Sequence, residues 1–77
     1  MSTMYIRLST IQDVRNFVEI VSMSDIEVDL SSGRYVVDAK SIMGIFSLDL
    51  LKPILLTAHT DDVGELFEKL KPFATEA

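Results

Sequence analysis

Apolar residues recur at two different periods along this chain, and the order of those periods constrains the fold more than any other feature. Between residues 11 and 21 they stand three or four positions apart, which is the spacing of an amphipathic helix. Between residues 26 and 39 most of them alternate with polar residues, which is the spacing of half-buried strands. The change of period predicts a fold in which helices cover a sheet.

The first half of the chain carries signals for each element boundary. A short strand is predicted over residues 4–8, and Thr10 with Asp13 three positions later resembles a capping box at the start of the first helix. Its apolar stripe runs from Ile11 to Val21. The two strands that follow are separated by Ser32 and Gly33, residues that favour a tight hairpin turn.

The second half of the chain carries boundary signals of the same kind. Ser41 precedes a short segment without alternation, which predicts a short helix capped by that serine. A fourth strand is predicted over residues 53–58 and a last helix over residues 63–70. Asp61 and Asp62 should open this helix at its positive end, and the tail from Thr75 onwards should fray.

The predicted element order is β-α-β-β-α-β-α. It indicates an α+β open-faced sandwich, with a four-stranded antiparallel sheet and the helices on one face. No linker, repeat or low-complexity run divides the sequence, so residues 1–77 are expected to form a single domain.

Charge and composition exclude several classes of protein. Twelve acidic residues against seven basic ones give a net charge of -5, and the cations are scattered, so we expect no nucleic-acid partner. No apolar run is long enough for a signal peptide or a membrane span. The absence of cysteine excludes disulfides and fits the reducing cytoplasm. We therefore expect a cytoplasmic protein without membrane association.

Residues 38–48 read Asp-Ala-Lys-Ser-Ile-Met-Gly-Ile-Phe-Ser-Leu, and this string resembles the regulatory-serine segment of HPr proteins from low-GC Gram-positive bacteria. The predicted element order is similar to that family along nearly the whole chain, and residues 17–41 align with it without gaps. The resemblance implies the HPr-like open-faced β-sandwich. It also implies a relation to the phosphoenolpyruvate-dependent sugar phosphotransferase system, in which the family carries phosphate on a histidine.

The histidine motif of that family, Gly-Leu-His-x-Arg-Pro, is missing. Ungapped alignment places Thr10 at the histidine position, Gln12 at the arginine position and Asp13 at the proline position. A small gap would instead bring Gln12 to the histidine position, as in the catabolite-repression HPr paralogue, which carries glutamine there. A threonine would form a stable phosphate ester, whereas histidine forms a transferable phosphoramidate. Both alignments therefore predict that histidine phosphoryl carriage is lost.

The resemblance assigns two roles to the short helix. Ser41 aligns with the regulatory phosphorylation site, and Ile42, Met43 and Phe46 align with the apolar patch that docks partner proteins. A phosphate at a helix start adds roughly -1.5 to -2 charges where the helix dipole accepts anions, so it need not unfold the domain. The implied partners are HPr kinase/phosphatase, a catabolite regulator or phosphotransferase enzymes.

The single histidine, His59, lies in the run His-Thr-Asp-Asp and raises the question of a metal site or a general base. No cysteine or second histidine is present to complete a soft metal site, and His59 lies away from the family's phosphorylation position. We interpret it as a solvated loop residue. No metal, cofactor or catalytic residue is predicted, and the chain is not expected to be an enzyme.

Three functions follow in order of preference. The leading hypothesis is a regulatory HPr-like protein modified at Ser41. The second is an adaptor or decoy that binds HPr partners without accepting phosphate, or that dimerises through its exposed sheet face. The third is a residual phosphocarrier that uses His59. The sequence leaves the oligomeric state and the identity of the bound partner open.

Overall fold

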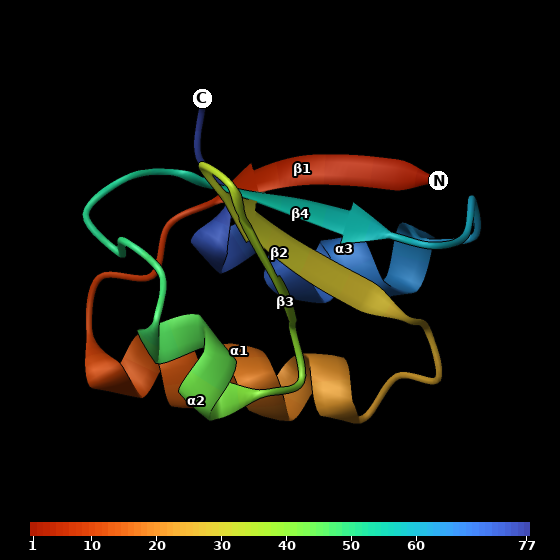
Figure 1. The fold of residues 1–77 in the computed structure, drawn as a ribbon. Coiled ribbons are helices and arrows are strands. Elements are labelled where there is room, and N and C mark those ends of the chain that lie inside the picture. Colours follow the sequence, from red (N-terminus) through yellow and green to blue (C-terminus); the bar gives the residue numbers. More distant parts are fainter.

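Four strands form one antiparallel sheet in the computed structural model, which describes all 77 residues (Figure 1). The strands are β1 (Ser2–Ile6), β2 (Val28–Ser32), β3 (Tyr35–Asp38) and β4 (Ile54–Ala58), in the spatial order β1-β4-β2-β3. The helices are α1 (Ile11–Ser22), α2 (Ile42–Phe46) and α3 (Gly64–Leu70), followed by a single 3-10 turn, η1 (Lys71–Phe73). The predicted fold class and element order are confirmed.

The core lies between the sheet and the helices and contains only apolar side chains. Sixteen residues are buried, and none of them is polar or charged. The helix α1 contributes Val14, Phe17 and Val21, at the predicted three- and four-residue spacing. The rings of Phe17 and Phe73 pack in a T-shaped arrangement, with a centroid distance of 5.8 Å and an angle of 89° between the ring planes, a favourable geometry for two aromatic rings.

The hairpin between β2 and β3 depends on Gly33. Ser32 pairs with Tyr35, so only two residues form the turn, and Gly33 adopts a φ of +60°. A glycine at the first of two turn positions is typical of a type II′ turn, whose twist matches the flanking strands. The predicted hairpin is confirmed.

The start of α1 departs in detail from the prediction. The Thr10 hydroxyl accepts a hydrogen bond from Asp13 N at 3.0 Å, as expected, but the Asp13 carboxylate accepts from Ser9 N rather than from Thr10 N. Ile11 was assigned to the apolar stripe, yet it is 68% exposed. It occupies the first position of the helix, one turn before the buried stripe begins at Val14.

The first strand lies two residues earlier than predicted, over residues 2–6 instead of 4–8. Its ladder with β4 ends at the pair Ile6 and Ile54. The residue before Ile54 is Pro53, which has no N–H to extend the ladder. Leu8 nevertheless remains buried in the core.

The predicted opening of α3 by two aspartates is wrong. The N-cap is Val63, which makes no side-chain capping bond. Asp61 instead lies 2.8 Å from the N-terminal ammonium, which lowers the pKa of that carboxyl through a hydrogen bond and charge attraction. Asp62 N donates to the Thr60 hydroxyl. Both aspartates are therefore used in the turn after β4, ahead of the helix.

The C-terminal segment is tied to the outer edge of β1, which corrects the predicted fraying at Thr75. Arg7 N donates to Phe73 O at 2.8 Å, and Thr75 N donates to Tyr5 O at 2.9 Å. The C-terminal segment thus covers part of the strand edge that would otherwise be open. No helix of the structure has the length and apolarity needed to cross a bilayer.

We expect the contact between Phe17 and Phe73 to be measurable by a double-mutant cycle. Phe17→Leu and Phe73→Leu should each lower the free energy of unfolding by about 1 kcal/mol, with a coupling energy of about 0.5–1.5 kcal/mol. Urea unfolding followed by circular dichroism measures both quantities. Phe67→Leu is the matched control, because Phe67 makes no ring pair with Phe17. Additive effects in the first cycle would contradict the prediction.

Candidate functional site

The helix α2 presents one side to the core and the other to solvent. Ile45 is completely buried, whereas Met43 is 77% exposed and Phe46 is 41% exposed. Ile42 is partly buried and packs against the core. We call the exposed side of this helix, with Ser41, Met43 and Phe46, the α2 surface. A large apolar side chain that remains this exposed on a folded domain is a candidate contact for another molecule.

Gly44 allows α2 to lie close to the sheet. A Cβ atom at this position would stand 3.2 Å from Val37 Cβ on β3 and 3.2 Å from Ser41 Oγ. Both distances are tighter than ordinary van der Waals contacts. The local sequence does not predict this role of Gly44, because the contact with β3 depends on tertiary packing.

Ser41 is the N-cap of α2, as predicted. Its backbone is extended, with φ of −100° and ψ of 103°, and its Oγ accepts a hydrogen bond from Gly44 N at 3.2 Å. The residue is exposed to solvent. The same oxygen that caps the helix is therefore accessible from outside.

Lys40, the residue before Ser41, is held in place by two hydrogen bonds. Its Nζ donates to Ser24 O at 2.8 Å, and its backbone N donates to the Asp38 carboxylate at 2.8 Å. The first bond joins the start of α2 to the segment that follows α1. The Lys40 ammonium is thus engaged with a carbonyl group, and its side chain positions the Ser41 segment.

The two residues predicted at the family's histidine position lie at the exposed start of α1. The Thr10 hydroxyl accepts a hydrogen bond from Asp13 N and forms no other, and Gln12 Nε2 donates to Asn16 Oδ1 at 2.9 Å. No basic side chain forms a hydrogen bond with either residue. Arg7 lines a shallow hollow of about 360 Å³ beside this helix start. The hydrogen bonds of Thr10 and Gln12 therefore cap α1 and join polar side chains on its surface.

Two further exposed apolar residues were not predicted. They are Ile11 at the start of α1, at 68%, and Leu51 after α2, at 85%. The helices α1 and α2 pack against each other (Figure 1). The helical spacing of Ile11 concealed its exposure, because only its place at the end of the stripe distinguishes it from core positions.

His59 is paired, contrary to the interpretation of a solvated loop residue. Its Nε2 lies 2.6 Å from Asp29 Oδ2, and both side chains are about one third exposed. The chain that follows β4 lies at the opposite side of the molecule from the start of α1 (Figure 1). No group of three or more potential metal ligands is found. The pair joins β2 to the chain after β4 on the solvent side of the sheet.

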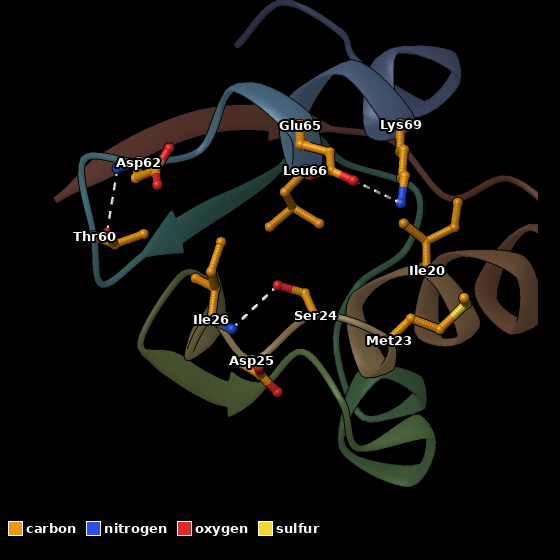
Figure 2. Close-up of a pocket in the computed structure, with 10 residues that line it drawn as sticks. All are labelled: Ile20, Met23, Ser24, Asp25, Ile26, Thr60, Asp62, Glu65, Leu66 and Lys69. Atoms are coloured by element: carbon orange, nitrogen blue, oxygen red, sulfur yellow. Dashed lines mark hydrogen bonds and ion pairs between the residues drawn. The ribbon is translucent and has the colours of Figure 1, made fainter.

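A second hollow of about 360 Å³ lies between the end of α1 and the start of α3 (Figure 2). Asp25, Asp62 and Glu65 line it together with apolar side chains, and Lys69 pairs with Glu65 at 3.5 Å. None of the predicted site residues contributes to it. The predicted site is therefore confined to α2 and the start of α1.

Comparisons with known proteins support the fold. No protein-family model matches the chain, and no curated protein sequence matches it. Among solved structures, it is similar to HPr-C-His from Thermoanaerobacter tengcongensis, with a TM-score of 0.76 and 27% identity over 91% of this chain and 86% of that chain. It is also similar to the phosphocarrier protein HPr from Bacillus anthracis str. Ames, with a TM-score of 0.73 and 23% identity over 96% of each chain. The chain thus has the α+β fold of HPr structures.

We expect Ser41→Ala to lower the free energy of unfolding by about 1 kcal/mol, because Gly44 N loses its capping partner. Ser41→Asp should recover most of this loss, since a carboxylate oxygen can also cap a helix. Thermal and urea unfolding of the three proteins measure the difference. An unchanged stability of Ser41→Ala would show that the bond between Ser41 Oγ and Gly44 N contributes nothing.

Proposed function

We propose that this chain is a regulatory HPr-like protein that accepts phosphate on Ser41 and docks partner proteins through the α2 surface. The observation that carries the proposal is the placement of an exposed serine hydroxyl at the start of a helix whose next turn exposes Met43 and Phe46. A modifying enzyme or a reader of the modification could contact the hydroxyl and the apolar side chains together. We further propose that residues 1–77 act as one domain.

A phosphate on Ser41 would change the α2 surface without a need to unfold it. The phosphoryl oxygens retain the ability to accept a hydrogen bond from Gly44 N, and they add roughly -1.5 to -2 charges. The two apolar side chains would then stand next to a strong anion. A partner protein could then tell phosphorylated from unphosphorylated chain by one charge-dependent contact at Ser41.

We propose that histidine phosphoryl carriage is absent. The side chain of Gln12 is an amide, which is a poor nucleophile, and the hydroxyl of Thr10 forms no hydrogen bond with a side chain that could act as its base. His59 is already paired with Asp29 on the sheet side of the molecule. The proposed role is therefore binding and regulation without catalysis or a cofactor. Its proposed partners in the cytoplasm are HPr kinase/phosphatase and a catabolite regulator.

A second candidate function is that of an adaptor or decoy that binds phosphotransferase enzymes without modification. The exposure of Ile11, Met43 and Phe46 favours it, because these apolar contacts exist whether or not Ser41 carries phosphate. The two candidates differ in one measurable property, the modification of Ser41.

The direct test is incubation of the purified chain with an HPr kinase and ATP, and separately with the phosphotransferase donor enzyme and phosphoenolpyruvate. Intact-mass and fragment spectra should show one phosphate on Ser41 from the kinase and none from the donor. Ser41→Ala should remain unmodified. Phosphate on His59 from the donor would overturn the proposal, and modification by neither enzyme would favour the adaptor.

We expect Met43→Asp to slow phosphorylation of Ser41 by the kinase about tenfold or more, because a carboxylate replaces an apolar docking contact. The matched control is Met23→Asp. Met23 is 78% exposed, nearly the same as Met43 at 77%, but it lies at the C-terminal end of α1, outside the α2 surface. Both variants should keep their stability within about 0.5 kcal/mol. Equal rates for the two variants would exclude Met43 from the docking contact.

A further inference from the structure

The two edges of the sheet differ in how they are protected. The outer edge of β1 is covered in part by the C-terminal segment, through the bonds at Arg7 and Thr75. The outer edge of β3 has no neighbouring strand, because the sheet order ends with β3 and the one bridge outside the named strands joins Ile6 to Ala74. An uncovered edge is a template for pairing with another chain.

The register of the hairpin determines which backbone groups of β3 face outward. Ala39 N donates to Val28 O, so these two residues form a hydrogen-bonded pair. Since hydrogen-bonded and non-bonded pairs alternate in an antiparallel ladder, Tyr35 and Val37 direct their backbone groups to β2. Val36 therefore directs its N–H and C=O away from the sheet, and Asp38 directs its N–H the same way.

The side chains along this edge are unusually exposed or unpaired. Tyr35 is 68% exposed and Val36 is 65% exposed. Arg34 and Asp38 lie at the two ends of the edge, are both exposed, and take part in none of the ion pairs of the structure. The edge thus has an apolar centre between a cation and an anion that form no ion pair within the chain, although Arg34 shares a hollow with Asp49 and Lys52.

This sequence is complementary to itself. If a second copy of β3 pairs antiparallel with Val36 opposite Val36, then Arg34 of each copy stands opposite Asp38 of the other. The outward direction of the backbone groups at Val36 and Asp38 allows this register. A shift of two residues in one direction would place Arg34 opposite Lys40, and a shift in the other direction would place it opposite Val36. Of these three registers, only the one with Val36 opposite Val36 pairs both charges.

We propose that β3 is the interface for a second copy of this chain, joined by antiparallel β3 pairing about a two-fold axis. Val36 of each copy exchanges N–H and C=O hydrogen bonds with Val36 of the other, and two ion pairs between Arg34 and Asp38 close the ends. The interface is isologous, since each residue makes the same contact in both copies. The two sheets join into one continuous eight-stranded sheet.

The solvent face of the sheet supports the same pairing. Val36 lies beside Ser31, Ser31 beside Leu55, and Leu55 beside Tyr5 in the registers of the four strands. This row is mostly apolar. In the dimer it adjoins the same row of the second copy at Val36, so the row becomes twice as long. Because β3 has only four residues, the buried area is small and the dimer should dissociate on dilution.

The test is sedimentation equilibrium of the full chain at concentrations from about 10 µM to about 1 mM. The average mass should rise from 8.6 kDa towards twice that value. Arg34→Asp and Asp38→Arg should each weaken the dimer about tenfold, because like charges then face each other. An equimolar mixture of these two variants should dimerise again, since each mixed pair restores both attractive contacts.

Val36→Pro provides a test that leaves the charges intact. Proline removes an N–H that makes no bond within the sheet, so the edge position tolerates it, but the bond to the second copy is lost. Circular dichroism checks that every variant is folded. Should Asp38→Arg fail to fold because its bond to Lys40 N is lost, Arg34→Asp and Val36→Pro carry the test. A monomer at every concentration, or a dimer that Val36→Pro does not weaken, would overturn the proposal.

Discussion

The position of β4 in the middle of the sheet is the constraint on which the rest of the structure depends. This strand comes late in the sequence, yet it pairs with β1 on one side and β2 on the other. Three of its residues are completely buried, namely Ile54, Leu56 and Ala58. Until β4 inserts, the first half of the chain has no continuous sheet for α1 to cover. A core without any buried polar group then depends on these two non-local pairings.

The local periods of the sequence predict much of the fold because each period is decided by neighbouring residues. Two features can be predicted without the order of the strands in the sheet. They are the apolar stripe that contains Val14 and Phe17, and the helix cap formed by Ser41. Two of the misassigned residues depend on distant partners. Asp61 meets the N-terminal ammonium, and His59 meets Asp29 across the sheet. Nothing in the local sequence indicates which segments the strand order brings together.

The candidate site also combines features that the local sequence predicts with features that depend on tertiary structure. Met43 and Phe46, which the sequence predicts as docking residues, are exposed, and Ile45 is the one residue of this short helix that is completely buried. The contact of Gly44 with Val37, which brings α2 close to β3, required tertiary structure. The similarity to HPr structures extends over most of the chain, whereas the roles of Thr10 and Gln12 remain predictions from the sequence.

Because α2 is short, the α2 surface should open locally more often than the rest of the domain. Of its five residues only Ile45 is completely buried, and a single side-chain cap holds its first turn. Such a helix opens by local fluctuation at a much lower free energy than the sheet does, and its amides should exchange with solvent ahead of those in β4. A binding protein could thus meet Ser41 in either a helical or an extended segment while the rest of the domain stays intact.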